Sequence, residues 1–443
     1  MKKLNLRTLR NLTLISLVLS AAPVYAQMQC RTTLGSHLSP IMGTDHLMAF
    51  EATMAPGIIT DYRIQGGMYL VAFDFSLWKQ SNLYFEGGYK NWSKVELDDD
   101  GANDINLPEL DSRHIGVRQF FYSFELPKTD VKLGLHETKL GNYLLVDERI
   151  LGASIDRNFG AVDINFRAGT VLQNFARMGQ FCANRHLYNL TQDNFTENIG
   201  EKPGETNLVG AVINWNPHYQ APVESSSDDE FSEFDDFGDF DEFSDDSGME
   251  DSTPLVNNIG LIVYQEMGSI IDDPKQYVGS LIDLNLPGEI SLRTGAVYQS
   301  LEDNNALVFI MQSRKAFMWN SGMNTDVIVS YIGQSDVDDS AIFQPLFSNL
   351  FIGEVMRMDA TSFPLWTAEV KHRFGGKLRY KTALKAVGQV EGDKTQEIDL
   401  ENSIHLLKHV QATLLLSHVE SDAFAVDFPD GVNMARMEVR VAF

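Results

Sequence analysis

The chain has 443 residues and a formal net charge of −26, from 35 Lys and Arg against 61 Asp and Glu. For so acidic a chain we expect no nucleic-acid partner, because nucleic-acid-binding surfaces are basic. Only two cysteines occur, Cys30 and Cys182, which excludes a disulfide framework and a cysteine-based metal site. These two residues could pair in an oxidising compartment.

The N-terminus predicts a secretory signal peptide over residues 1–26. Four basic residues precede an apolar run over residues 12–22, and Val24-Tyr25-Ala26 places small residues at the −3 and −1 positions. The run is about half of the ~20 residues that a membrane-spanning helix needs. We therefore expect cleavage between Ala26 and Gln27, followed by a periplasmic segment over residues 27–45.

From residue 46 onward the hydrophobic pattern has the period of two, which is typical of strands with two different faces. In residues 376–388, for example, Tyr380 and Leu384 alternate with Lys381 and Lys385. The segments run for about 10 residues, which is the length of a tilted strand that crosses a bilayer. A secreted β-sandwich would also alternate, but the charge-rich polar face and the aromatic residues near segment ends favour a transmembrane β-barrel.

Seventeen strands can be placed from the pattern, and barrels of this class have even numbers. We predict an all-β, antiparallel up-and-down barrel of 16 or 18 strands over residues 46–443, with 18 preferred. The missing strand is expected inside 173–206, and 140–158 is interpreted as an outer loop. The predicted strands are 46–55, 67–78, 81–95, 113–126, 129–139, 159–172, 207–216, 257–266, 276–286, 289–300, 305–313, 324–333, 364–374, 377–388, 396–406, 409–420 and 434–443.

The last strand resembles the closing strand of Gram-negative outer-membrane proteins. Its apolar residues share one face, and the final residue is a phenylalanine: Met437, Val439, Val441 and Phe443. The resemblance implies an insertion signal that the barrel-assembly machinery reads. We therefore expect the outer membrane as the location and its lipid as a partner.

Residues 224–252 form an acidic insertion with fourteen Asp and Glu and no Lys or Arg. Such a block repels itself and should be disordered. Counting strands back from the C-terminus places it on the periplasmic side. One interpretation is a solvated low-complexity loop. The other is a tether for a basic partner, with phenylalanines at every third position as contact points: Phe231, Phe234, Phe237, Phe240 and Phe243.

Catalytic and metal-binding motifs are absent from the sequence, and the histidines do not cluster at metal-ligand spacing. We therefore expect no cofactor, no metal and no enzymatic activity, although an outer-membrane enzyme with a dispersed site stays an alternative. The histidines in strands are interpreted as structural or lumen-lining residues.

The polar face of the predicted strands should line the lumen and set its selectivity, because rings of Lys and Arg favour anions. An alternative with equal weight is that these cations pair with acidic residues on neighbouring strands. The predicted lumen cations are Lys132, Arg167, Arg293, Lys371, Arg373, Lys377, Arg379, Lys381, Lys385, Arg436 and Arg440. The predicted counter-charges are Glu369, Glu397, Asp399, Glu401 and Glu438.

The segment Arg118-Gln119-Phe120-Phe121-Tyr122-Ser123-Phe124, followed by Lys132-Leu133-Gly134-Leu135, resembles a strand–loop–strand block of the alginate-export and phosphate-selective porin-like families. Those families often carry Arg-Gln after the glycine, where this chain has His136-Glu137. The resemblance implies an 18-strand passive channel for anionic solutes. Two alternatives remain, a scaffold that binds a basic periplasmic or surface partner and an outer-membrane enzyme, and the sequence leaves monomer or trimer open.

Overall fold

The structure, a computed structural model, describes most of the predicted strand regions and a few connecting residues. No helix in this part of the chain is long and apolar enough to cross a membrane. The described residues are 38–40, 46–54, 56–59, 62–96, 112–140, 145–172, 205–218, 254–269, 271, 273–301, 305–319, 322–336, 343, 351–352, 358–359, 364–375, 379–390, 394–407, 409–422 and 431–442.

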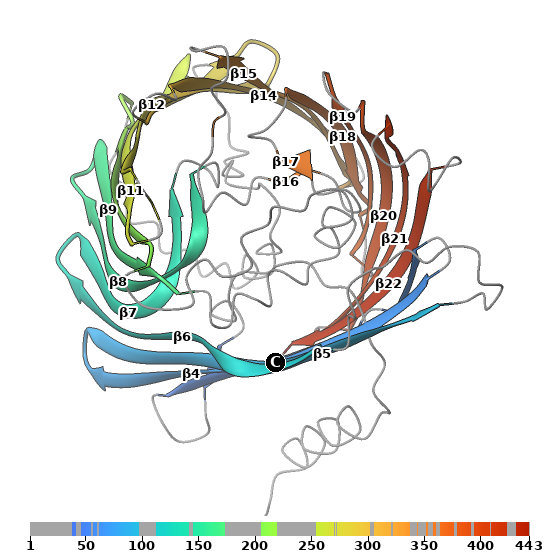
Figure 1. Cartoon of the computed structure of the whole chain (residues 1–443), viewed down its shortest axis with the longest axis horizontal. Coiled ribbons are helices and arrows are strands. Elements are labelled where there is room, and N and C mark those ends of the chain that lie inside the picture. The colour runs from blue at the N-terminus through green and yellow to red at the C-terminus, as the bar shows by residue number, and fades with distance from the viewer. Residues whose placement is uncertain are drawn as a thin grey trace, which may run out of the picture.

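Eighteen antiparallel strands form a closed barrel in which each strand pairs with its neighbours along the chain (Figure 1). The first nine are β2 (Leu47–Met54), β4 (Tyr62–Trp78), β5 (Ser81–Glu96), β6 (Ser112–Leu126), β7 (Thr129–Leu140), β8 (Val146–Asn158), β9 (Val162–Val171), β10 (Asn207–Trp215) and β11 (Val256–Met267). The other nine are β12 (Lys275–Leu286), β13 (Ile290–Ser300), β14 (Ala306–Met318), β15 (Asn324–Asp336), β18 (Leu365–Arg373), β19 (Tyr380–Gln389), β20 (Gln396–Leu407), β21 (Val410–Glu420) and β22 (Val432–Ala442).

The barrel closes where β22 meets the start of the wall. Residues Val439–Ala442 of β22 pair with β2. Residues Met434–Arg436 pair with β3 (Gly57–Ile59), a short continuation of the first strand. Pro56 lies between β2 and β3, and a proline has no N–H to give to a ladder. The Pro56 carbonyl still accepts a hydrogen bond from Met437 N at 2.9 Å, so the seam remains closed across the interruption.

Three short strands are not part of the wall. β1 (Ser39–Pro40) pairs with the start of β2, so part of the predicted segment 27–45 lies against the barrel. β16 (Phe351–Ile352) and β17 (Met358–Asp359) pair with each other and lie inside the ring of strands in Figure 1. The connection between β15 and β18 therefore enters the barrel.

The predicted fold is confirmed, and each of the seventeen predicted strands overlaps a wall strand. The location of the eighteenth strand was wrong. β9 pairs directly with β10, which leaves no place in the wall for a strand from 173–206. The missing strand is β8, in the segment that was interpreted as an outer loop.

The alternation of apolar and polar residues does not predict β8, and the reason is physical. Its first residues, Asp147-Glu148-Arg149, are charged in succession and do not alternate. Parts of β7 and β8 curve into the ring in Figure 1, and β7 reaches β10 although β8 and β9 lie between them. Both faces of this hairpin tip therefore contact protein, and the lipid-facing alternation is not required there.

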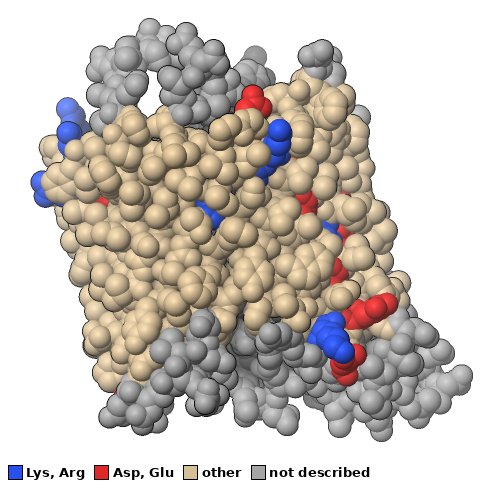
Figure 2. Space-filling view, turned by 90° about the horizontal axis from the view of Figure 1, so that it is seen from above, with Lys and Arg blue, Asp and Glu red and all other residues tan. Residues whose placement is uncertain are grey.

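Alternation along the other strands separates a lumen face from an exterior face. In β22, Arg436, Glu438 and Arg440 are buried on the inside, and Met437 is 49% exposed on the outside. The predicted face of Met437, Val439 and Val441 is thus the exterior, whereas Phe443 lies outside the described residues. Figure 2 shows one side of the barrel as a broad band of uncharged residues, as contact with lipid tails requires.

Candidate functional site: the charged lumen wall

The wall formed by β18, β19 and β22 carries most of the predicted cations. Their shared feature is a position on the lumen face, opposite exterior residues such as Val370, Leu384 and Met437. The cations placed there are Lys371, Arg373, Lys381, Lys385, Arg436 and Arg440. Arg379 is different: it lies in the turn before β19 with a positive φ of 40° and is exposed. Lys377 lies outside the described residues.

The predicted counter-charges lie on the same face and alternate with the cations from strand to strand. Lys371 Nζ lies 3.5 Å from Glu369 Oε2, and Lys381 Nζ lies 4.0 Å from Glu401 Oε1. Lys385 is the register partner of Glu369 on one side and of Asp399 on the other. This arrangement supports internal pairing of the ladder, because opposite charges directly across strands attract each other.

The charges of this wall differ in how much water they meet. Glu397 and Asp399 are 1% and 2% exposed, and Glu438 is 5% exposed. The side chains of Lys381 and its partner Glu401 are 25% and 24% exposed, and Arg379 is exposed. A solute in the lumen would therefore meet the exposed cations of β19 more directly than these buried carboxylates.

One buried ion pair joins this wall to β2, and a second lies on β14 and β15, the strands that precede β18. Arg440 Nη2 binds Glu51 Oε2 of β2 across the closing seam. On the other side, the Nε and Nη2 of Arg314 both donate to Asp326 Oδ1, at 3.2 and 3.1 Å. Asp326 is the register partner of Lys371, so the row of charges continues from β14 to β19.

The remaining predicted cations lie outside this wall, Lys132 on β7, Arg167 on β9 and Arg293 on β13. Arg167 Nη1 lies 2.6 Å from Asp156 Oδ1, and Arg293 Nε lies 2.6 Å from Asp283 Oδ1. Lys132 lies over the ring of Phe121, with Nζ 5.4 Å from the ring centroid. The structure thus places all three on the lumen face but does not bring them together with the ladder.

A buried cluster on β5 and β6 was not singled out from the sequence. Glu86 has no exposed surface, and its carboxylate binds Arg118 Nη1 at 2.7 Å. Tyr84 donates its hydroxyl to Glu86 Oε2 at 2.7 Å, and Gln119 Nε2 donates to the same oxygen at 3.5 Å. The alternation of Tyr84 and Glu86 with the apolar Leu83 and Phe85 would have placed them in the lumen.

His136 is one of the histidines interpreted as structural. Its Nδ1 lies 2.9 Å from the carbonyl oxygen of Gly134, which can only accept a hydrogen bond. Nε2 then accepts from the hydroxyl of Ser154 on β8. This pairing joins β7 to β8 on the lumen side.

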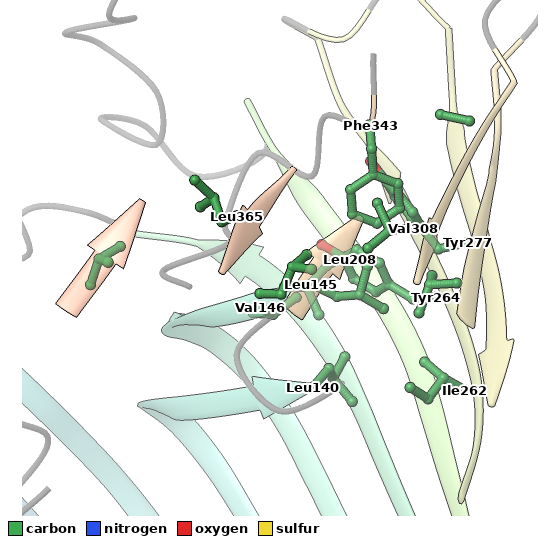
Figure 3. Packing of buried hydrophobic residues seen from close by; sticks show 14 of the residues in the cluster. Leu140, Leu145, Val146, Leu208, Ile262, Tyr264, Tyr277, Val308, Phe343 and Leu365 are labelled. Atoms are coloured by element: carbon green, nitrogen blue, oxygen red, sulfur yellow. The ribbon is translucent and has the colours of Figure 1, made fainter. Parts of the chain in front are cut away.

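An apolar cluster lies inside the barrel near the ends of the strands that carry the longer connections. Figure 3 shows Phe343 beside Tyr277 and Tyr264, with Leu208 and Val308 next to them. The ring centroids of Phe343 and Tyr277 are 5.6 Å apart in an edge-on arrangement. Since Phe343 belongs to the connection between β15 and β18, this connection packs against the inner wall.

Several predicted features lie outside the described residues. They are the signal peptide, the tether candidates Phe231, Phe234, Phe237, Phe240 and Phe243, and the cysteines Cys30 and Cys182. The strands that flank the acidic insertion are described: β10 ends at Trp215 and β11 begins at Val256. Because strands alternate in direction, both residues lie at the end of the barrel that carries the short turns at 79–80, 127–128 and 287–289.

Comparisons with known proteins bear on the fold. No family model and no curated protein matches the chain. Solved structures similar to it include Pseudomonas aeruginosa OpdK with vanillate, with a TM-score of 0.50 and 10% identity over 90% of this chain and 98% of that one. Another is Pseudomonas aeruginosa OccK5 (OpdH), with a TM-score of 0.50 and 9% identity over the same shares of the two chains. A further OpdK structure is described as an outer membrane protein, with a TM-score of 0.49 and 10% identity over 90% of this chain and 99% of that one.

At such low identity the likeness shows the fold alone. It agrees with the closed antiparallel barrel described above. The narrower resemblance to alginate-export and phosphate-selective families stays a prediction.

Proposed function

We propose that the protein is an outer-membrane channel for the passive passage of small anionic solutes. The observation that carries the proposal is the division of the wall into an uncharged exterior and a lumen face with rows of charged residues. Charged residues that line the lumen of a lipid-embedded barrel are typical of a water-filled channel, where they set selectivity. The structures of similar fold are outer-membrane proteins, which supports the proposed location.

The proposed preference for anions rests on β19 and the turn before it. Lys381 and Lys385 are partly exposed and Arg379 is exposed, whereas Glu397 and Asp399 are buried. OpdK was solved together with vanillate, a carboxylate, which is compatible with the same solute class. Fixed charges at the water-filled surface dominate the selectivity of a pore.

The test is the reversal potential of the purified protein in a planar bilayer under a salt gradient. Replacing Arg379, Lys381 and Lys385 by Ser should shift the reversal potential toward cations. The matched control is the double variant Arg293→Ser with Asp283→Ser, which removes one charge of each sign from the lumen and should leave the potential unchanged. An unchanged potential in the conducting triple variant would refute the anion preference, and a protein without conductance would refute the channel.

A second candidate is the scaffold, because both flanks of the acidic insertion lie at the short-turn end. Short turns are periplasmic in outer-membrane barrels, so we propose that the insertion meets periplasmic proteins. Deleting residues 225–252 should leave conductance intact and abolish salt-sensitive capture of a basic periplasmic protein. Surface labelling of an epitope inserted at Gly238 on intact cells would refute the periplasmic side.

A further inference from the structure

The ladder between β6 and β7 covers only part of their length. It begins at the pair Phe120 and Leu135 and runs down to Leu126 and Thr129. Above it, Ser112–Val117 of β6 pair with β5 alone among the described residues, and His136–Leu140 of β7 pair with β8 alone. Apart from the closing seam, the other neighbouring strands of the wall are joined by longer ladders among the described residues. The wall is therefore split between Ser112–Val117 of β6 and His136–Leu140 of β7, and this gap in the ladder is called the split below.

Three glycines in one row explain why the two strands part. Gly134 of β7 is the register partner of Gly152 of β8, and Gly152 is the partner of Gly169 of β9. A Cβ on Gly152 would lie 2.1 Å from the carbonyl oxygen of Ala168 and 2.5 Å from the Cα of Gly169. The lumen face is thus folded too tightly for a side chain, as at a sheet corner.

Beyond this bend the tip of the β7–β8 hairpin packs inside the barrel. Leu140, Leu145 and Val146 belong to the apolar cluster that contains Leu208 and Tyr264 (Figure 3). A Cβ on Gly210 of β10 would lie 3.0 Å from Leu140 Cδ1. The hairpin tip therefore lies inside the barrel and not in the wall, whereas Ser112–Val117 of β6 stay in the wall, paired with β5.

The outer side of the split is apolar and open. Ile115 is 85% exposed, more than any other large hydrophobic residue in the described part of the chain, and Val117 and Phe120 are 41% and 50% exposed. Ile115 is the register partner of Tyr89, which stacks on Tyr69 with ring centroids 6.4 Å apart. Aromatic girdles mark the membrane–water interface, so the split faces the outer leaflet near its polar boundary.

The inner side of the split is polar. The Gln119 side-chain oxygen accepts a hydrogen bond from the backbone N–H of Glu137 at 3.1 Å, directly across the split. Arg118 lies next to it, bound to Glu86 and within electrostatic range of Glu137 and Arg149. Below them, the exposed Lys132 extends over Phe121 on the lumen face. Backbone groups at an open sheet edge are costly in hydrocarbon, so this edge requires water or a polar ligand from the lumen.

We propose that the split between β6 and β7 is a lateral portal that admits single-chain amphiphiles with an acidic head from the outer leaflet into the lumen. The apolar rim at Ile115, Val117 and Phe120 suits the chain of such a molecule. The acidic head would replace the Gln119 side chain as the acceptor for the N–H of Glu137 and then reach Lys132. The proposal rests on the lumenal channel proposed above, because the amphiphile has to enter a lumen that conducts.

The experiment uses single-channel recordings of the full chain with Cys30→Ser and Cys182→Ser as background. Gln119→Cys with Glu137→Cys places a reversible disulfide across the split. The control pair, Tyr122→Cys with Leu133→Cys, closes a place where β6 and β7 already pair. Dodecanoate, delivered in the membrane at a concentration that leaves the bilayer intact, is the amphiphile, and butyrate is the short homologue that can enter only through the aqueous mouth.

Dodecanoate should block the lumenal current of the reduced split pair, and oxidation should slow the onset of block at least fivefold and leave the effect of butyrate unchanged. The control pair should behave alike in both redox states. Val117→Trp, which fills the rim without a disulfide, should also slow the block. Equal block in the oxidised and reduced split pair, or no block of a conducting reduced channel, would overturn the portal. Absence of any current would instead refute the channel itself.

Discussion

The wall from β18 to β22 and the wall from β5 to β9 both present alternating charges to the lumen, but they hold them in different ways. In the first, the ladders from β18 to β20 run without a register shift, and cations such as Lys371 and Lys381 have acidic neighbours on the same or the next strand. In the second, a row of glycines folds β7 to β9 inward and separates β7 from β6. Here the fully buried pair is the cluster around Glu86 and Arg118, and the Arg167–Asp156 pair and Lys132 lie on the strands beyond the split.

The difference teaches that backbone geometry, and not charge content, distinguishes the two walls. A continuous ladder places its charges along the lumen face, where the partly exposed Lys381 and Glu401 can meet a passing solute. In a bent wall, part of the charged face packs against a neighbouring strand. There the same residue types form buried ion pairs that hold the strands together, as Glu86 and Arg118 do. The three predictions below test this contrast, from the largest expected effect to the smallest.

The first prediction concerns the bend itself. Gly152→Val should abolish or severely reduce the folded barrel, because the new side chain would collide with the backbone of β9. Ala153→Val is the matched control: it adds bulk at the next residue, on the exterior face, and should fold. Heat-modifiable migration on gels measures the folded fraction. A fully folded Gly152→Val protein would show that the bend has room for a side chain and is not fixed by the glycine row.

The second prediction compares the ion pairs of the two walls. Glu86→Gln leaves the buried Arg118 with a neutral partner, and breaking a buried pair in this way costs about 3–5 kcal/mol. Glu401→Gln breaks the pair with Lys381 in the wall from β18 to β22, whose side chains are 24% and 25% exposed, and should cost less because water can solvate the remaining charge. Urea unfolding in lipid vesicles measures both free energies. Equal losses would contradict the view that the split wall depends more strongly on its charges.

The third prediction tests the exterior of the uninterrupted wall. Met437→Arg puts a cation on the lipid face near the middle of β22, where the cost is about 2–4 kcal/mol. Asn433→Arg is the control near the outer end of the same face, where the cost falls to about 0–1 kcal/mol. The amount of folded protein in the membrane and its unfolding free energy report the difference. If both variants were equally stable, this face of β22 would not be embedded in lipid.

The sequence alone determined the class of fold because a lipid-facing strand must alternate. Wherever one face meets hydrocarbon and the other meets the lumen, as in β19 and β22, the period of two is visible, and Lys381, Lys385, Arg436 and Arg440 lie on the face that this period indicates. The same reasoning placed the acidic partners Asp399 and Glu438 on the inside. It could not place Arg379 in a turn, because the alternation simply continues through that residue.

The tertiary structure alone decided where the alternation is suspended and which charges meet. β8 was missed because its tip lies inside the barrel, where no lipid imposes a period. The pairs Arg440–Glu51 and Arg118–Glu86 join residues 389 and 32 positions apart, and only the closure of the barrel and the bulge between β5 and β6 bring them together. Period is a local property of the chain, and so the sequence shows it; bending and closure depend on neighbouring strands, and so only the folded barrel fixes them.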